Sequence, residues 1–319
     1  MLITQPGQTW VTDLGRLAGP SKGLSVNGAL DQYACRVANI IVGNDDSESL
    51  LESLHFGPTF IAEQNLLIAV TGAECEVTID DRPVPTWAPH SVRAGQRVCV
   101  GPPTRGLRTY TAVRGGIRVD RILGSCAPDN MLGFGTRLTE NMHLSGPTPV
   151  PELHNRHFGM PLMMLPVPDR TLSPTPTIPV TDGPDIGEFG DNVEVLCDTV
   201  YRVSPRSNHV GLRLEGTPPR RVAQGEVLSR GVPVGAIEVP SGDELLILHR
   251  GRGVTAGYPV LAVVTALGLD QLAHVVPGEE VRFQRVSVDE ARDSYIAQCL
   301  RLTSLRRTCS VLLREHGIL

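Results

Sequence analysis

Two apolar runs decide the fold class predicted for this chain: Leu66-Leu-Ile-Ala-Val-Thr71 in its first half and Val260-Leu-Ala-Val-Val-Thr265 in its second. Both are short, rich in β-branched residues and close to turn residues, which is typical of β-strands. Similar runs predict further strands at 76–79, 97–100, 108–113, 234–239, 245–249 and 281–286. Strands this short and closely spaced, with few helical patterns between them, favour a mainly β fold of the barrel or sandwich kind.

A proline-rich segment separates the two β-rich halves, with ten prolines from Gly146 to Pro184. Because proline lacks the amide hydrogen and fixes φ, this stretch is predicted to be an extended connection rather than a central strand or a helix. A chain of 319 residues is long enough for two domains that each bury a core. We predict an N-terminal domain over 1–146, a connection over 147–176 and a C-terminal domain over 177–319 that ends in a helix.

Two helices are predicted among the strands. Apolar residues at 34, 37, 38, 41 and 42 form a helical stripe over 31–42, which ends at Gly43-Asn44, a pair that accepts the left-handed conformation after a helix. Near the C-terminus, Ser287-Val-Asp-Glu290 has the form of a capping box ahead of a long helix. We expect this C-terminal helix to pack on the second domain or on a partner protein.

The charge composition excludes several classes of function. Of the 29 basic residues only Lys22 is a lysine, and the formal net charge is −5 without any basic run. The absence of a Gly-Lys pair excludes a Walker A loop, and Lys22 does not lie between methionines as a biotinylated lysine would. We therefore predict no covalently bound cofactor. Binding to nucleic acid or to an anionic membrane surface is not expected.

Cysteine and histidine patterns indicate the compartment and argue against a metal site. Seven scattered cysteines without a Cys-x-x-Cys pair, and no basic-then-apolar N-terminal segment, predict a soluble protein of the reducing cytoplasm without disulfides. The nine histidines show no metal-ligand spacing. Gly19-Pro-Ser-Lys-Gly23 matches the G-x-S-x-G pattern of a hydrolase elbow, but no strand precedes it, so a loop is predicted.

Two regions are denser in polar groups than a barrel core requires. The first holds Asp13, Arg16, Asn27 and Asp31 ahead of a helix N-terminus, where guanidinium and helix-end amide groups could hold an anionic or carbonyl substrate. The alternative is that Asp31 only caps its helix and Asp13 pairs with Arg16.

The second region lies in the other half of the chain. Donor-rich residues occupy 204–214, and a Gly-containing turn at 252–259 holds Arg252, Thr255 and Tyr258. The alternative interpretation is a pair of solvated hairpins.

A series of motifs, in order along the chain, resembles one family. The motifs are Val11-Thr-Asp-Leu-Gly-Arg16, Gly23-Leu-Ser-Val-Asn-Gly-Ala-Leu-Asp31, Ala38-Asn-Ile-Ile-Val-Gly-Asn44, Val70-Thr-Gly-Ala73, Arg114-Gly-Gly-Ile117, the 207–214 segment, Gly235-Ala-Ile-Glu-Val-Pro240, Ala256-Gly-Tyr-Pro259 and Pro277-Gly278. Together they resemble the allophanate hydrolase subunit 2 family, which is also called the biotin-dependent carboxyltransferase-domain family or the KipA family and includes the C component of 5-oxoprolinase. The resemblance covers nearly the whole chain.

The resemblance implies a fold of two cyclophilin-like β-barrel subdomains and a role in a hetero-oligomer. The implied partners are a subunit 1 protein, which is similar to KipI or to the B component of 5-oxoprolinase, and a LamB/YcsF-type protein. Such a complex is similar to the 5-oxoprolinase that opens 5-oxoproline to glutamate with ATP. The alternatives are a urea carboxylase-like carboxyltransferase, with biotin on another protein, and a non-catalytic KipA-like regulator. Amidase chemistry is not expected, because the Ser-Ser-Lys segment of allophanate-cleaving enzymes is missing.

Within this hypothesis, arginines would bind a substrate carboxylate or stabilise oxyanion charge, and carboxylates would handle or orient protons. The predicted catalytic residues are Asp13, Arg16, Asp31, Arg213, Glu238 and Tyr258, and the predicted substrate-binding residues are Asn27, Asn39, Ser207, Arg252 and Thr255. The chain departs from the family pattern at Asn208, His209, Glu238 (commonly Gln) and Gly251 (commonly Asp).

Overall fold

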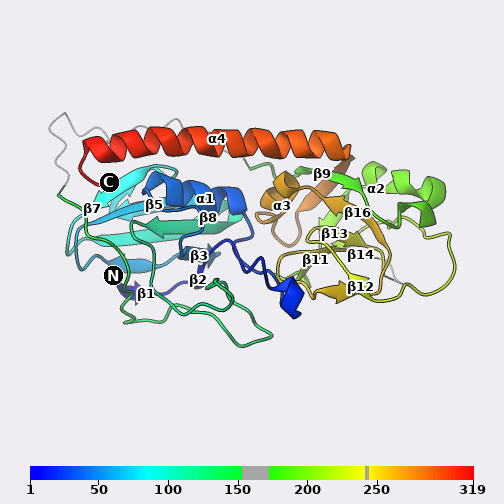
Figure 1. Ribbon diagram of the computed structural model, residues 1–319, viewed down its shortest axis with the longest axis horizontal. Coiled ribbons are helices and arrows are strands. Elements are labelled where there is room, and N and C mark those ends of the chain that lie inside the picture. Colours follow the sequence, from blue (N-terminus) through cyan, green and yellow to red (C-terminus); the bar gives the residue numbers. More distant parts are fainter. Residues whose placement is uncertain (153–171, 241–243) are drawn as a thin grey trace. The chain divides into compact units, whose positions relative to one another are not determined.

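The computed structural model describes residues 1–152, 172–240 and 244–319. The chain forms two compact units (Figure 1). The first comprises Met1–Gly15, Asp31–Thr171 and Gln298–Leu319, and the second Arg16–Leu30 and Leu172–Ala297. The units therefore interleave along the sequence instead of meeting at one break. The middle of the predicted proline-rich connection, 153–171, lies outside the described residues.

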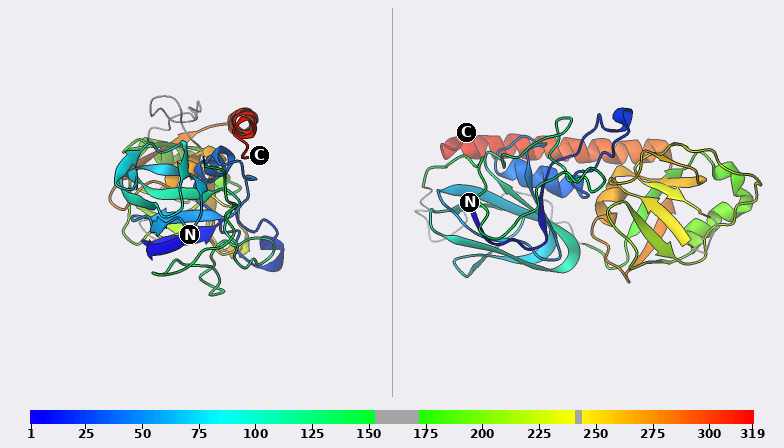
Figure 2. Two further views of the ribbon diagram at one scale, coloured as in Figure 1. Left: turned by 90° about the vertical axis from the view of Figure 1, so that its left-hand side faces the viewer. Right: turned by 90° about the horizontal axis from the view of Figure 1, so that it is seen from below.

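An eight-stranded sheet forms the first unit. Its strands are β1 (Leu2–Gln5), β2 (Thr9–Thr12), β3 (Leu50–Leu54), β4 (Thr59–Ile61), β5 (Leu66–Ile79), β6 (Arg82–Val84), β7 (Pro89–Val92) and β8 (Arg97–Val113). Strand β8 pairs with β4 near its start and with β3 near its end, and with β5 along most of its length. The long strand β8 thus connects β3 and β4 on one side with β5 on the other. The sheet curves around its apolar core as a half-barrel (Figure 2).

The prediction of separate strands at 66–71 and 76–79 is wrong, because both belong to β5, and those at 97–100 and 108–113 both belong to β8. The pairing of β5 with β8 shifts register between Gly72 and Val77. Gly72 has a φ of 94°, a conformation open to glycine at little steric cost. The bend lets a single strand continue around the curved sheet, where the sequence shows a break in the apolar pattern.

A closed barrel forms the second unit, with strands in the order β10-β11-β14-β13-β16-β9-β17. Their bounds are β9 (Thr177–Asp182), β10 (Tyr201–Val203), β11 (Gly211–Glu215), β13 (Ala236–Glu238), β14 (Glu244–Leu248), β16 (Val260–Val264) and β17 (Glu280–Arg285), and a separate pair is β12 (Arg230–Gly231) with β15 (Thr255–Ala256). Only β9 and β17 pair in parallel among the described strands. Apolar side chains such as Ile178, Ile237 and Val281 fill the interior. The mainly β fold class predicted from the sequence is confirmed.

The helices are few and mostly short. They are α1 (Gln32–Ile41), α2 (Val195–Asp198), α3 (Ala266–Leu272), α4 (Val288–Glu315) and the 3-10 turns η1 (Pro20–Lys22), η2 (Ile186–Glu188) and η3 (Gly190–Glu194). The predicted capping box of α4 is present, since the Ser287 amide donates to the Glu290 carboxylate at 2.8 Å and the Glu290 amide donates to Ser287 Oγ at 3.1 Å. In the described part of the chain, none of the helices is long and apolar enough to cross a membrane.

The C-terminal helix was expected on the second domain or on a partner, but its later part lies in the first unit. Gln298–Leu319 belongs to that unit, and the buried positions Leu302, Leu305, Cys309 and Leu313 repeat at helical spacing. Arg306 donates to the Asn44 carbonyl at 3.0 Å and also pairs with Asp46. The buried stripe and these polar contacts dock the end of α4 beside the turn that follows α1.

Candidate functional site

The predicted site residues divide between the two units. The first unit contains Asp13, Asp31 and Asn39, and the second contains Arg16, Asn27, Ser207, Arg213, Glu238, Arg252, Thr255 and Tyr258. Each unit therefore has its own group of candidates. Among the described residues, no group of three or more His, Cys, Asp and Glu side chains is placed to hold a metal ion.

Asp13 is buried at the end of β2, and the chain itself uses both of its carboxylate oxygens. Oδ1 accepts hydrogen bonds from the Gly15 amide at 2.8 Å and from Ser125 Oγ at 2.6 Å, and Oδ2 accepts from the Cys126 amide at 2.8 Å. Asp13 also forms an ion pair with Arg121, at 3.6 Å between Nη1 and Oδ2. Burial, reinforced by the Asp13 charge, raises the pKa of the Cys126 thiol. This geometry is that of a carboxylate that holds a turn in place.

Asp31 and Asn39 lie at the two ends of α1. Asp31 caps the helix, because its Oδ1 accepts from the Ala34 amide at 2.9 Å. Asn39 donates from Nδ2 to the Glu48 carbonyl at 2.8 Å and accepts from Asn44 at 3.0 Å. Asp31 thus caps α1, and Asn39 joins the end of this helix to the turn that follows it.

The sequence did not predict the buried series of hydrogen bonds beside Asp31. The Asp31 amide donates to the Tyr110 hydroxyl at 2.9 Å, and this hydroxyl donates to Glu52 Oε1 at 2.7 Å. Burial raises the pKa of Tyr110 well above its usual value, so the phenol stays protonated. The only sequence signal was a tyrosine and a glutamate within strands, which by itself is common.

In the second unit, the turn that follows β14 is fixed at several points. The His249 amide donates to the Val210 carbonyl at 2.9 Å, and the Asn27 amide donates to the Arg250 carbonyl at 2.9 Å. Ser25 Oγ donates to the Arg252 carbonyl at 2.6 Å. Two segments that are distant in sequence, 25–27 and the one that contains Val210, therefore hold the turn. Asn27 itself has a φ of 52°, a left-handed conformation that asparagine tolerates better than most residues.

Arg252 is 5% exposed and points its guanidinium at one carbonyl group. Nε and Nη2 donate to the Val232 carbonyl at 3.0 and 2.7 Å. Nη1 is buried and has no hydrogen-bond acceptor among the described residues. Burial, and then the charge of Arg250, lower the pKa of Arg252. The predicted role of Arg252 in substrate binding is therefore compatible with its position, whereas the neighbouring Arg250 was not singled out from the sequence.

Gly251 lies where a side chain would not fit. A Cβ atom at this position would be 2.6 Å from His209 Cδ2, 2.8 Å from the His209 carbonyl oxygen and 3.3 Å from Asn27 Oδ1. His209 and Gly251, two positions at which the chain departs from the family pattern, are therefore in contact. A glycine at 251 allows the histidine ring to pack directly against the turn.

We expect Gly251→Ala to lower the free energy of unfolding by about 1–3 kcal/mol, because the added methyl group displaces either the His209 backbone or the turn. Urea denaturation of the purified chain measures this change. Gly253→Ala is the matched control, since its Cβ would meet only the Thr255 carbonyl oxygen, at 3.5 Å. Equal stabilities for the two variants would contradict the close packing described here.

Glu238 is a buried carboxylate in an apolar setting. It is 1% exposed and pairs across the sheet with Leu246 of β14 and Val260 of β16. Side chains alternate along a strand, so Glu238 shares the face of Ala236, which packs with Val232 in an apolar cluster outside the barrel core. Its Oε1 has no hydrogen-bond partner among the described residues, and burial raises its pKa to about 7. A carboxyl group tuned in this way can take up and release a proton near neutral pH.

The other predicted residues of this unit are less enclosed, except Arg16. Arg16 is fully buried, and its amide donates to the Val26 carbonyl at 2.8 Å. Arg213 pairs with Glu244, and its amide donates to Ser207 Oγ at 3.0 Å. Thr255 is exposed in β15 and Tyr258 is 45% exposed. The structure thus places Ser207 and Arg213 together and leaves Thr255 and Tyr258 at the surface of this unit.

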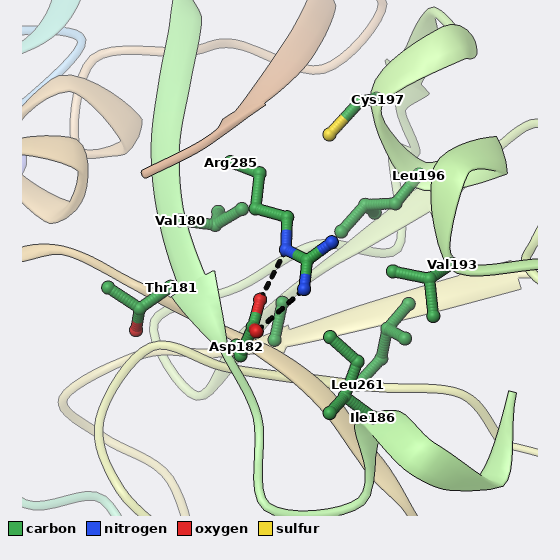
Figure 3. A pocket seen from close by; sticks show the side chains of 10 residues that line it. Val180, Thr181, Asp182, Ile186, Val193, Leu196, Cys197, Leu261 and Arg285 are labelled. Carbon is green, nitrogen blue, oxygen red and sulfur yellow. Dashed lines mark hydrogen bonds and ion pairs between the residues drawn. The ribbon is translucent and has the colours of Figure 1, made fainter. Parts of the chain in front are cut away.

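A small pocket of the second unit lies apart from all these residues (Figure 3). Apolar side chains including Val180, Val193 and Leu196 line it, and Arg285 reaches across it to Asp182. The two ion-pair distances, Nε to Oδ1 and Nη2 to Oδ2, are 2.5 and 2.6 Å. None of the predicted site residues is among those that line this pocket.

The chain combines a half-barrel sheet with a closed barrel, and comparison with known sequences gives the family of this two-unit β protein. A family profile described as "Carboxyltransferase domain, subdomain A and B" matches residues 22–285. The C component of 5-oxoprolinase from Escherichia coli (strain K12) is 32% identical over 89% of this chain and 90% of that protein. The chain belongs to this carboxyltransferase-domain family, and the resemblance inferred from its motifs is confirmed.

Solved structures of longer proteins share the fold. Kluyveromyces lactis urea carboxylase superposes with a TM-score of 0.84 at 27% identity, over 95% of this chain and 29% of that chain. TTHA0988 superposes with a TM-score of 0.77 at 29% identity, over 89% of this chain and 55% of that chain. This chain therefore spans about half of one of these proteins and less than a third of the other.

Proposed function

We propose that this chain is the C-type component of a 5-oxoprolinase, acting with a subunit 1 protein (similar to KipI or to the B component of 5-oxoprolinase) and a LamB/YcsF-type protein. One observation supports it most: the match to the relative named as the C component of 5-oxoprolinase covers 89% of this chain and 90% of that protein. In the relatives named urea carboxylase or urea amidolyase, the matched region is only a fraction of a longer chain.

The reaction opens a cyclic amide. Water oxygen adds to the carbonyl carbon, the ring C–N bond breaks, and the freed nitrogen takes up a proton, while ATP hydrolysis in the complex drives the step. Such a reaction needs donors that bind the substrate carboxylate or stabilise oxyanion charge, and a group that handles protons. In the second unit, Arg252 has a buried donor to offer and Glu238 has a carboxyl group with a pKa of about 7. These two side chains are our strongest candidates for those roles in this unit.

The test is reconstitution. The three proteins are co-expressed, and glutamate formation from 5-oxoproline and ATP is measured with and without this chain. We expect turnover only with all three components. ATP-dependent turnover of equal rate without this chain would reject the proposal.

A second candidate is a urea carboxylase-like carboxyltransferase with its biotin on another protein, favoured by the TM-score of 0.84 with urea carboxylase. Avidin separates the two, because it should abolish a biotin-dependent reaction and leave 5-oxoproline opening intact. A stable heteromer with no turnover of either substrate would instead indicate a KipA-like regulatory protein.

A further inference from the structure

The Arg252 side chain is a buried cation whose charge no carboxylate among the described residues neutralises. Its three nitrogens have one protein acceptor, the Val232 carbonyl, which is shared by Nε and Nη2. Nη1 is buried with no acceptor in the described part of the chain. Arg250 adds a second positive charge nearby, and burial together with this charge lowers the pKa of Arg252.

Such an arrangement is unfavourable for the chain by itself. A buried charged donor is normally paired with an acceptor, because a lost hydrogen bond to water is not otherwise replaced. A neighbouring like charge increases the cost. An anion that accepts from Nη1 would satisfy this donor and neutralise the Arg252 charge through a charge-assisted hydrogen bond.

The surrounding backbone holds this donor in a fixed place. Ser25, Asn27 and the carbonyls of His209 and Val210 fix the 249–252 turn through hydrogen bonds of 2.6 to 3.2 Å. The guanidinium plane is fixed by its two bonds to one oxygen. A donor that is already ordered loses little conformational freedom when a ligand binds.

We propose that Arg252 is a binding site for a carboxylate-type oxyanion that accepts a hydrogen bond from Nη1. The choice of anion rests on the proposed function: 5-oxoproline presents a carboxylate in the oxoprolinase reaction, whereas hydrogencarbonate shares the same planar chemistry in the carboxyltransferase alternative. The site itself needs no partner protein, since Arg252, Arg250, Val232, Ser25 and Asn27 all belong to the second unit.

The test uses the isolated full-length chain and isothermal titration calorimetry, with 5-oxoproline and hydrogencarbonate as separate probes and chloride at equal ionic strength as the reference. We expect 5-oxoproline to bind and Arg252→Gln to weaken its binding by about 10- to 100-fold, the usual effect of losing a hydrogen bond to a charged group. Arg202→Gln is the control, because Arg202 is a surface arginine paired with Glu280.

Arg252→Lys keeps the positive charge with fewer donors, and circular dichroism shows whether each variant is folded. If Arg252→Gln does not fold, Arg252→Lys takes its place, with weakened binding again expected. Unchanged binding in a folded Arg252 variant, or no binding of either probe by the wild-type chain, overturns the site.

The two proposals fail separately. Binding of hydrogencarbonate but not of 5-oxoproline retains the site and favours the carboxyltransferase alternative, while the reconstitution assay decides the oxoprolinase assignment. Reconstituted oxoprolinase turnover with Arg252→Gln kinetics equal to wild type, including KM, retains that assignment and overturns the site.

Discussion

Replacing Glu238 with glutamine is expected to raise the free energy of unfolding by about 3 kcal/mol at pH 8 and to leave it almost unchanged at pH 4. The folded-state pKa of Glu238 is raised by burial from 4.5 to about 7. Below pH 4.5 the carboxyl group is neutral in both the folded and the unfolded chain, so its ionisation does not lower the free energy of unfolding. As the pH rises from 4.5 to 7 the unfolded chain loses its proton first, and stability falls. Above pH 7 the full cost of the buried charge remains.

Urea denaturation at a series of pH values measures this difference. Glutamine has nearly the same shape and carries no charge, so the variant should lack the stability loss between pH 4.5 and 7. Glu215→Gln is the matched control, because Glu215 is exposed on β11. Parallel pH profiles for wild type and Glu238→Gln would show that this carboxylate is not buried as a charge.

Asp13→Ala is expected to destabilise the chain by about 4 kcal/mol, because it leaves several buried donors without an acceptor. The donors are the Gly15 and Cys126 amides and the Ser125 hydroxyl, which are bound at 2.6 to 2.8 Å. The loss of the Arg121 ion pair adds little, since Arg121 is 38% exposed. Equilibrium denaturation at pH 7 measures the change.

Asp120→Ala serves as the comparison, because Asp120 is exposed in the same loop and surface substitutions of this kind change stability by about 0.5 kcal/mol or less. If Asp13→Ala were as stable as Asp120→Ala, the carboxylate would not be holding the 125–126 turn. A variant of wild-type stability that abolished turnover would instead support the catalytic role predicted for Asp13 from the sequence.

Local signals in the sequence predicted local structure well. The apolar stripe over 31–42 and the Ser287-Val-Asp-Glu290 capping box correspond to α1 and to the start of α4. Both depend on interactions within four residues, which a single sequence contains in full. Each of the strands β5 and β8 was predicted as two strands, because a bulge within a strand and the end of a strand look the same in the sequence. Both appear as a glycine between two apolar runs.

The sequence pointed to candidate residues for a site but not to the contacts that these residues make. Asp13 and Arg16 stand close together in the sequence, but nothing in the sequence points to the hydrogen bonds of Asp13 with Ser125 and Cys126. The sequence analysis did not select Arg250, and it gave no reason to prefer Arg252 over the other candidate arginines. Arg252 differs from the other candidates in being buried against the Val232 carbonyl. No spacing rule in the sequence predicts that these two residues are in contact.

The sequence by itself determined the β-rich fold class, the caps of two helices and the family, because strand periodicity, capping and motif order are written in neighbouring residues. Only the tertiary structure decided that the barrel closes through β9 and β17, that Arg16–Leu30 joins the second unit, and that Glu238 and Arg252 lose contact with water. The reason is physical: burial and desolvation depend on which distant segments pack together, and they set the charge state and the unmet hydrogen bonds on which chemistry depends.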